Sequence, residues 1–354
     1  MAYRIAVGGA TGNVGGVMLA TLAARGFPAE QVVALASARS VGQTVDYGGN
    51  RLTVSDLARH DFNQTDILFL STGGENSSVL SPQAAETGCV VIDNSSAFRM
   101  APDVPLVVPE VNVSALDGWS ARRILPVANC STIQLAVALA PLHRAAGIRR
   151  VVVATYQSVS GGGKRQVARL RQEVETARLA GSTVTWPTPE TDEAVVPYAF
   201  NVIPHIDSFL DDGRTREEWK MEQELHKILA PEIRLSATCV RVPVMVGHAE
   251  AVNVELARAL DVATARRLLA EAPGITVHDT PAPGGYATPL SAAGEDDVFV
   301  SRLRADPTVT NGLNLWVVAD NVRKGAALNA VQIAEALIQR ADFNAHVTRR
   351  RGTA

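Results

Sequence analysis

Short apolar runs alternate with helix-length segments through the first 130 residues of the chain. Residues 3–7 form an apolar run that leads into a glycine-rich turn, and residues 17–25 then repeat apolar positions with a helical period. Apolar runs of strand length recur at residues 32–36, 67–71 and 90–93. Because a strand followed by a crossover helix usually pairs in parallel with another strand, this alternation predicts a mostly parallel, doubly wound sheet.

The pattern changes after residue 130, where longer helical periods and β-branched strands take over. Helices are predicted over residues 133–146, 165–179, 217–229 and 326–341. Strands are predicted over residues 151–158, 233–243, 251–257, 298–306 and 313–318. Pro187 and Pro189 predict a loop between two of these elements. The chain beyond residue 130 is therefore expected to form a second, sheet-rich domain.

Composition narrows the class of protein further. The chain has 354 residues, of which 47% are hydrophobic and 19% charged, which is enough apolar material for a substantial core. A net charge of -3 gives no field to attract nucleic acid or an anionic membrane. The sequence contains no apolar run of membrane-spanning length, so we expect a soluble cytoplasmic protein. The arginines at residues 349–351 are expected to form a solvated tail.

Cys89, Cys130 and Cys239 are the three cysteines, and they lack CxxC spacing. This argues against a disulfide framework and against a zinc site, so no metal is expected. Cys89 and Cys239 lie in apolar strand contexts and are interpreted as buried structural thiols. Cys130 differs because polar residues surround it and an apolar helix follows. Since a helix N-terminus favours the thiolate, Cys130 is the candidate nucleophile, with a structural thiol as the alternative.

A glycine turn with the spacing GxxGxxG occurs at Gly9, Gly12 and Gly15, at the first strand-to-helix junction. Backbone N–H groups and the helix N-terminus there would bind a pyrophosphate, although tight turns also use glycine for steric reasons. The next strand leads to Arg39 and Ser40 instead of an acidic residue. An arginine suits the 2′-phosphate of NADP, so NADP is the expected cofactor, with an ordinary surface arginine as the alternative.

Several charged residues beyond this turn are candidates for acid–base chemistry or for anion binding. His248 follows a predicted strand and a glycine, so we expect it to be exposed in a cleft, where its pKa suits proton transfer. A structural histidine is the alternative. Arg99 and Arg241 lie in apolar or small surroundings, and they suit either an anionic substrate or a structural ion pair. Glu217 and Lys220 are spaced i, i+3 on a helix, which by default indicates a surface ion pair.

Taken together, these segments resemble aspartate-β-semialdehyde dehydrogenase along nearly the whole chain. The residues that carry the resemblance are 9–15, 37–40, 95–99, 107–112, 129–132, 155–161, 200–205, 241–248 and 320–325. So many motifs in one order make the resemblance specific. Two positions depart from the family pattern. Ala128 stands where proline commonly precedes Asn-Cys, and Glu75 stands where smaller residues are usual, so loop rigidity or cofactor affinity could differ.

The resemblance implies the reduction of β-aspartyl phosphate to aspartate β-semialdehyde by NADPH, with release of phosphate, on the route to lysine, threonine and methionine. Cys130 would form the acyl thioester, His248 would be the general acid/base, and Gln157 would orient the acyl group. The substrate residues that it implies are Arg241 for the carboxylate, Glu217 for the amino group, Arg99 and Lys220 for the phosphate, and Asn129, Ser160 and Gly161 lining the site. The implied cofactor residues are Gly9, Thr11, Gly12, Asn13, Val14, Arg39, Ser40 and Asn321. Glu217 is preferred to Glu218 only because of its i, i+3 step to Lys220.

The resemblance also implies the fold class. It is α/β, with a Rossmann-type doubly wound NADP-binding domain and an α+β catalytic and dimerisation domain that has a mixed sheet. The NADP-binding domain is expected at residues 1–130 and 326–354, with the C-terminal helix returning to it, and the second domain at residues 131–325. A homodimer or a tetramer is expected, with the second domain forming the interface.

Two other functions remain open on the sequence. N-acetyl-glutamyl-phosphate reductase has the same reaction type with a longer, acylated substrate, but Glu217 favours a substrate with a free amino group if it lines the pocket. A non-catalytic NADP-binding redox sensor would keep the glycine turn but would need no nucleophile. The combination of Cys130 with His248 and two arginines argues against the sensor.

Overall fold

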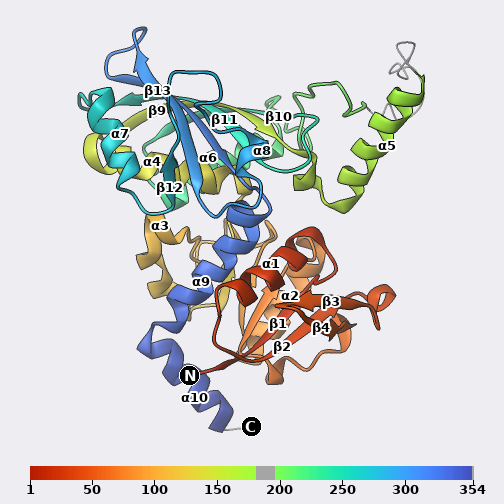
Figure 1. Cartoon of the computed structure of the whole chain (residues 1–354). Helices are drawn as coiled ribbons and strands as arrows, with labels where there is room; N and C mark the ends of the chain where they lie inside the picture. Colours follow the sequence, from red (N-terminus) through yellow and green to blue (C-terminus); the bar gives the residue numbers. More distant parts are fainter. Residues whose placement is uncertain (181–195, 353–354) are drawn as a thin grey trace. The chain divides into compact units, whose positions relative to one another are not determined.

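Residues 1–180 and 196–352 are described by the computed structural model of the chain (Figure 1), and the loop predicted around Pro187 and Pro189 lies outside them. The chain forms two compact units. The first unit comprises Met1–Val137, Glu224–Ala230 and Val322–Ala354, and the second comprises Ala138–Gln223 and Pro231–Asn321. The short segment Glu224–Ala230 thus groups with the first unit, whereas the sequence pattern assigned it to the second domain.

The first unit contains a six-stranded, all-parallel sheet in the order β5-β2-β1-β6-β7-β8. Its strands are β1 (Tyr3–Gly8), β2 (Ala29–Ala36), β5 (Ser55–Asp56), β6 (Ile67–Leu70), β7 (Val90–Asp93) and β8 (Ile124–Pro126). Every residue of β6 and β7 is buried, as expected for parallel strands that are covered on both faces. Strand β2, which follows β1 in the chain, pairs with one side of β1, and the later strand β6 pairs with the other side. The turn after β1 therefore lies at the point where the strand order reverses.

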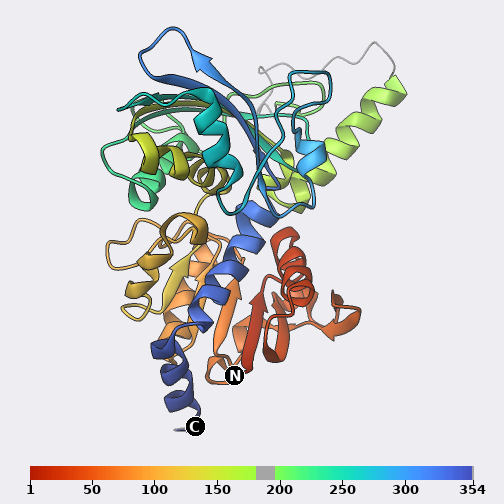
Figure 2. The ribbon, with the colours of Figure 1, turned by 60° about the vertical axis from the view of Figure 1, so that its left-hand side comes forward.

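Helices and a β-hairpin complete the first unit. They are α1 (Asn13–Ala24), β3 (Thr44–Tyr47), β4 (Asn50–Thr53), α2 (Gly74–Glu86), α3 (Pro109–Asn112), a π-helix (Arg323–Ala327), α9 (Leu328–Ile338) and α10 (Ala341–Gly352). Helix α9 packs against α1 and β7, although nearly the whole second unit separates them in the sequence. Figures 1 and 2 show this blue helix lying across the parallel strands.

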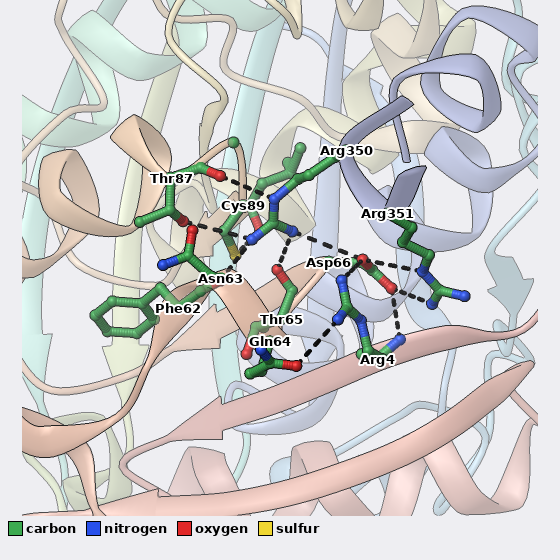
Figure 3. A network of polar contacts seen from close by, with 12 residues as sticks. Arg4, Phe62, Asn63, Gln64, Thr65, Asp66, Thr87, Cys89, Arg350 and Arg351 are labelled. Atoms are coloured by element: carbon green, nitrogen blue, oxygen red, sulfur yellow. Dashed lines mark hydrogen bonds and ion pairs between the residues drawn. The ribbon is translucent and has the colours of Figure 1, made fainter. Parts of the chain in front are cut away.

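Helix α10 ends in two arginines that are fixed to the body of the first unit (Figure 3). The guanidinium group of Arg350 donates to the backbone carbonyl of Phe62 at 2.6 Å, to that of Thr87 at 2.8 Å, and to that of Thr65. These carbonyls belong to loops that precede β6 and β7. One side chain of α10 therefore completes the hydrogen bonding of two loops that are distant in the sequence.

Arg351 is bound through a buried carboxylate next to Arg350. It forms an ion pair and a hydrogen bond with Asp66, whose side chain is 0% exposed. The same carboxylate accepts from the Arg4 backbone N–H at 2.8 Å and from the Arg4 guanidinium at 3.0 Å. The prediction of a solvated tail at residues 349–351 is therefore wrong for Arg350 and Arg351, because Asp66 and the loop carbonyls provide buried partners.

The second unit contains a mixed six-stranded sheet in the order β10-β9-β11-β14-β13-β12. Its strands are β9 (Ile148–Gln157), β10 (Arg234–Arg241), β11 (His248–Leu256), β12 (Ile275–Val277), β13 (Val298–Asp306) and β14 (Gly312–Ala319). The two outermost pairs are parallel, and the inner pairs are antiparallel. The predicted combination of a doubly wound parallel sheet and a second domain with a mixed sheet is confirmed.

The remaining helices are α4 (Cys130–Ala146), α5 (Lys164–Ala180), α6 (Arg216–Ile228), α7 (Val262–Ala270) and α8 (Pro289–Ala292). Helix α4 starts in the first unit and ends in the second, and helix α6 starts in the second and ends in the first. Helix α5 extends away from the sheet of the second unit in both views (Figures 1 and 2). Among the described residues, every helix is too short or too polar to cross a membrane.

Candidate active site

The glycine turn after β1 has the backbone geometry of a phosphate-binding turn. Gly9 has a φ of +81°, and a Cβ added to it would lie 2.2 Å from the carbonyl oxygen of Ser71. A Cβ added to Gly15 would lie 2.2 Å from the carbonyl oxygen of Gly9, so α1 can approach the turn only with glycine at that position. Helix α1 begins at Asn13, directly after Gly12. Its first backbone N–H groups therefore lie beside a turn in which Gly9 and Gly12 carry no side chain that would keep a pyrophosphate away.

The end of β2 lies next to this turn. The backbone N–H of Gly9 donates to the carbonyl oxygen of Leu35 in β2 at 2.9 Å. Thr11 Oγ1 donates to Ser40 Oγ at 3.5 Å, which joins the glycine turn to the 3-10 helix Ala38–Ser40. Arg39 lies in that helix and is exposed. The residues expected to bind the phosphates and the 2′-phosphate of NADP are thus adjacent in the first unit.

Cys130 is the first residue of α4, three residues before the start that the sequence pattern predicts. Asn129 precedes it and acts as the N-cap, because its Oδ1 accepts from the backbone N–H groups of Ser131 at 3.0 Å and Thr132 at 3.3 Å. The thiol is partly exposed, unlike the other cysteines. A helix N-terminus of this kind stabilises a thiolate through oriented backbone N–H groups.

The other two cysteines have the buried environments that the sequence predicts. Cys89 is fully buried, and burial raises the pKa of its thiol to about 12. Burial also raises the pKa of the Cys239 thiol, and the nearby carboxylate of Glu217 raises it further. Both thiols therefore stay protonated at neutral pH, and Cys130 is the thiol with access to solvent.

Gly325 packs directly against the nucleophile candidate. It lies in the π-helix Arg323–Ala327, and a Cβ added to it would lie 2.7 Å from Cys130 Cβ and 3.2 Å from Cys130 Cα. The adjacent Lys324 is fully buried, and its Nζ pairs with Glu110 at 2.6 Å and donates to Gln332 at 2.8 Å. The π-helix is thus held in place by buried polar contacts, and it packs closely against one side of Cys130.

Arg99 lies in the first unit and is 8% exposed. Its Nη1 pairs with Glu224 Oε1 at 3.0 Å, and its Nη2 donates to the carbonyl oxygen of Asn94 at 3.1 Å. Within the described part of the chain, the Nε of Arg99 has no hydrogen-bond partner. Arg99 therefore forms a structural ion pair and can also bind an anion, because it keeps unused N–H groups beside the paired ones. The sequence leaves both of these roles open.

Four candidate residues of the second unit meet at one edge of its mixed sheet. Gln157 ends β9, and Arg241 ends the parallel strand β10, where the two residues are register partners. His248 begins the antiparallel strand β11 and is paired with Ala319 at the end of β14, two residues before Asn321. Strands β9, β10 and β14 end at the edge of the sheet where the antiparallel strand β11 begins. Residues 157, 241, 248 and 321 therefore lie at this edge.

His248 is 0% exposed, so the expectation of an exposed histidine is wrong. The glycine before it does not form an open turn, because β11 starts at once and is covered by β9 and β14 on its two sides. The His248 Nδ1 accepts from the backbone N–H of Ser158 at 3.0 Å and lies 3.1 Å from Ser158 Oγ. This contact places the ring proton of neutral His248 on Nε2.

The environment of His248 favours the neutral ring. Burial lowers its pKa well below the ordinary value, and the positive charge of Arg241 lowers it further. Among the described residues, the Nε2 of His248 has no hydrogen-bond partner. A Cβ placed on Gly161 would lie 3.3 Å from that Nε2 and 3.2 Å from Arg241 Nη1. Both polar groups therefore lie beside a residue that has no side chain to cover them.

A hydrogen-bonded group centred on Asn321 holds this edge together. Its Oδ1 accepts from Ser158 Oγ at 3.0 Å, from Ser160 Oγ at 3.1 Å and from the backbone N–H of Gly247 at 2.9 Å. Arg241 Nη1 donates to the carbonyl oxygen of Ser158 at 2.6 Å. Asn321 thus fixes the loop that carries Ser160 and the start of the strand that carries the histidine. Ser158 also belongs to this group, although its sequence context does not mark it as a candidate.

Glu217 and Lys220 form the predicted ion pair, at 3.3 Å, but their side chains are only 8% and 14% exposed. The pair is therefore buried rather than a surface contact. Lys220 also pairs with Asp207 at 2.5 Å, and Glu217 Oε1 accepts from Gln157 Nε2 at 3.1 Å. Glu218 instead accepts from the backbone N–H groups of Thr215 and Cys239, which is a structural role. Glu217 is thus the glutamate that contacts the candidate residues Gln157 and Lys220 through hydrogen bonds.

The candidate residues form two clusters, one in each unit. The first unit carries Gly9, Thr11, Gly12, Asn13, Val14, Arg39, Ser40, Arg99, Asn129 and Cys130. The second unit carries Gln157, Ser160, Gly161, Glu217, Lys220, Arg241, His248 and Asn321. Sequence reasoning missed Glu224, whose helical spacing is that of an ordinary polar position.

Two family models match the chain and agree with its division into two units. Residues 4–119 match the model described as "Semialdehyde dehydrogenase, NAD binding domain". Residues 139–324 match the model described as "Semialdehyde dehydrogenase, dimerisation domain". The first match covers the parallel sheet with its glycine turn, and the second covers the mixed sheet with its polar edge.

Individual proteins resemble the chain over nearly its whole length. An aspartate-semialdehyde dehydrogenase from Aquifex aeolicus is 46% identical over 341 residues, which cover 96% of this chain and 99% of that protein. One from Legionella pneumophila is 48% identical, over 94% of this chain and 95% of that protein. A crystal structure of aspartate semialdehyde dehydrogenase II from Vibrio cholerae, complexed with ASA, has a TM-score of 0.91 and 45% identity. It matches 96% of this chain and 99% of that one.

Proposed function

The chain belongs to the aspartate-semialdehyde dehydrogenase family, and from this premise we propose how its residues divide the reaction among themselves. The activity is that of an aspartate-semialdehyde dehydrogenase, an oxidoreductase of aspartate-family amino acid biosynthesis. In detail, β-aspartyl phosphate is reduced to aspartate β-semialdehyde, and phosphate is released. The observation that carries the assignment of roles is Cys130, a partly exposed thiol at the N-terminus of α4.

Cys130 acts as the nucleophile. Its thiolate attacks the acyl carbon of β-aspartyl phosphate, the new C–S bond forms, and the C–O bond to phosphate breaks with its electron pair leaving on phosphate. Arg99 and Lys220 bind the phosphate and stabilise the charge that develops on it. The unused N–H groups of Arg99 support this role, because they remain available beside the pair with Glu224.

The neutral ring of His248 carries its proton at Nε2, and this N–H group interacts with the oxygen of the acyl group. When bound, NADPH supplies the hydride that reduces the thioester. The His248 Nε2–H donates to the oxygen that becomes negative, and the C–S bond then breaks to return Cys130 as the thiolate. Gln157 orients the acyl group, in keeping with its buried position at the end of β9.

We propose NADP as the cofactor, which is a finer statement than the match to an NAD-binding domain. The glycine turn fits a dinucleotide because Gly9 allows the tight turn after β1 and Gly15 allows α1 to pack closely against it, which brings the N-terminus of α1 to the turn. Arg39 fits the 2′-phosphate because it is exposed beside Ser40 and Thr11. Gly12, Asn13 and Val14 would line the pyrophosphate. Asn321 would contribute to the nicotinamide side of the site.

Substrate selection is proposed to depend on charge. Arg241 binds the substrate carboxylate, and Glu217 binds the amino group. Ser160, Gly161 and Asn129 line the site. The buried position of Glu217 beside Gln157 supports this role, since a buried carboxylate favours a charged amine as its partner. The family places the second unit in dimerisation, so we propose a homodimer or a tetramer, in a reducing cytoplasm that keeps Cys130 as a thiol.

The decisive experiment is phosphate-dependent reduction of NADP by aspartate semialdehyde, compared between the wild type, Cys130→Ala and Cys89→Ala. We expect the Cys130 variant to lose turnover, and the Cys89 variant to keep it because that thiol is buried and protonated. Wild-type activity with N-acetyl-glutamate semialdehyde instead would overturn the substrate. Tight NADPH binding without turnover of either aldehyde would favour the redox sensor.

A further inference from the structure

Glu224 is a buried carboxylate to which the proposed reaction gives no role. It lies in α6, is 1% exposed, and belongs to the short segment of that helix that packs with the first unit. A carboxylate is costly to bury unless both of its oxygens find partners. Its partners therefore indicate why a charged residue occupies this position.

The two oxygens of Glu224 bind two different candidate residues. Oε1 pairs with Arg99 Nη1 at 3.0 Å. Oε2 accepts from the backbone N–H of Asn129 at 2.5 Å. The residue proposed to bind phosphate and the residue immediately before Cys130 are thus joined by one carboxylate. They are about 30 positions apart in the sequence, and they lie in the segments that follow the paired parallel strands β7 and β8.

Asn129 transmits this contact to the nucleophile. Its backbone N–H is held by Glu224, and its side chain caps α4 through the N–H groups of Ser131 and Thr132. Cys130 lies between these anchored groups and is limited on another side by Gly325. The direction of the thiol is therefore set by Glu224 on one side and by the π-helix on the other.

Arg99 is held by the same helix at a second point. Lys227, three residues after Glu224, donates from Nζ to the carbonyl oxygens of Arg99 and Ala101, each at 2.8 Å. A carboxylate next to a phosphate-binding arginine weakens its attraction for an anion, so electrostatics alone would disfavour Glu224. With Glu224 in place, Arg99 attracts an anion less strongly, but its orientation relative to Asn129 is fixed.

We propose that Glu224 is a positioning residue, which aligns Arg99 with the Asn129–Cys130 backbone so that the phosphate of the substrate and the thiol are held in register. This inference rests on the proposed function for the role of Arg99, but the contact with Asn129 can be tested without it. Fixed relative geometry of this kind is worth about 100-fold in rate when it is lost by a shift of about 1 Å.

The test compares Glu224→Gln and Glu224→Leu with Glu222→Gln, a matched change on the same helix at a carboxylate that pairs with Arg214 near the surface. Glutamine keeps the shape of Glu224 but can accept from only one of the two partners, and leucine can accept from neither. We measure the KM for phosphate and kcat in the phosphate-dependent reaction. Hydrogen exchange of peptides that cover residues 129–132 and residues 67–70 is measured on the free protein.

We expect Glu224→Gln to raise the KM for phosphate and to lower kcat/KM by about 100-fold, with Glu222→Gln within twofold of the wild type. Glu224→Leu is expected to speed exchange at residues 129–132 while residues 67–70 stay protected. A purely structural role predicts uniform loss of protection and an unchanged KM in the folded fraction, and that result would overturn the inference.

If Glu224→Leu does not fold, the KM for phosphate of the isosteric glutamine variant still distinguishes a positioning role from a structural one. A wild type without phosphate-dependent turnover would end the proposed function, whereas selective exchange at residues 129–132 would leave the anchoring of Asn129 standing.

Discussion

The backbone N–H of Ser158 donates to Nδ1 of His248 at 3.0 Å, which leaves the proton of the neutral ring on Nε2. A protonated ring would carry N–H groups at both nitrogens and would lose this bond. The contact and the burial of the ring therefore act in the same direction, since burial lowers the pKa of His248 and the charge of Arg241 lowers it further. In the proposed reaction, His248 would therefore act as a neutral hydrogen-bond donor.

The first prediction concerns pH and stability. Because the pKa of His248 is lower in the folded protein than in the unfolded chain, the unfolded chain binds more protons below about pH 6.5. Stability should thus fall as the pH falls from 7.5 to 5.5, by at most about 1.4 kcal/mol per pH unit from this group. His248→Asn removes the titrating group, so its melting temperature should depend less on pH than that of the wild type. An equal slope for both proteins would contradict the buried neutral ring.

The second prediction concerns Gly325. Gly325→Ala places a methyl group 2.7 Å from Cys130 Cβ, so the thiol or the π-helix must move. We expect kcat/KM to fall by about 10- to 100-fold and the rate of Cys130 alkylation to change. Gly118→Ala is the control, because its added Cβ would contact only Pro105, at 4.0 Å. Normal kinetics in Gly325→Ala would mean that the π-helix can move to accept the methyl group without moving Cys130.

The third prediction concerns cofactor choice. Arg39→Ala should weaken NADPH binding by about 10- to 100-fold, the value of a charge-assisted hydrogen bond, and should leave NADH binding nearly unchanged. Arg59→Ala removes another exposed arginine of the same unit, one that pairs with Asp56 at 3.7 Å, and should alter neither affinity. Equal losses for both cofactors in Arg39→Ala would assign Arg39 to the pyrophosphate instead of the 2′-phosphate.

The fourth prediction concerns the attachment of α10. Burial raises the pKa of Asp66, but hydrogen bonds from Arg351 and Arg4 outweigh it and hold the pKa below its ordinary value. Asp66→Asn should therefore lower the free energy of unfolding by about 3–5 kcal/mol, because it leaves arginines without their buried partner. Arg349→Ala, at an exposed position of the same helix, should change it by less than about 0.5 kcal/mol. The Asp66 effect should diminish as the pH falls below about 4, the ordinary pKa of an aspartate, because the wild-type carboxylate becomes protonated as the pH passes through its lowered pKa.

The sequence predicts well where the signal is local. The glycine turn, the strands β6 and β7 and the start of α4 near Cys130 each follow from apolar runs and turn residues within a short window. Strand order and register are not local, and for this reason the meeting of Gln157, Arg241 and His248 at one edge follows only from the pairing of β9, β10 and β11. The family resemblance supplied this grouping where the pattern of residues could not.

The errors have a common physical origin. His248 was expected in an open cleft because a glycine precedes it, yet the strand starts at once and is central in its sheet. Arg350 and Arg351 were expected in solvent because they are a charge run, yet partners from residues 62–87 bind them. Glu224 has the spacing of a polar surface position. In each case the burial of a polar residue depends on a distant partner, which a local pattern does not contain.

The packing of α9 and α10 on strands from the first third of the chain has a consequence for biosynthesis. During translation, the parallel sheet emerges with the surface that α9 covers still bare, and Asp66 still lacks Arg351. At about 5–20 residues per second, tens of seconds pass before residues 322–354 can reach it. The nascent first unit is therefore an unfinished domain that must wait for its own last segment.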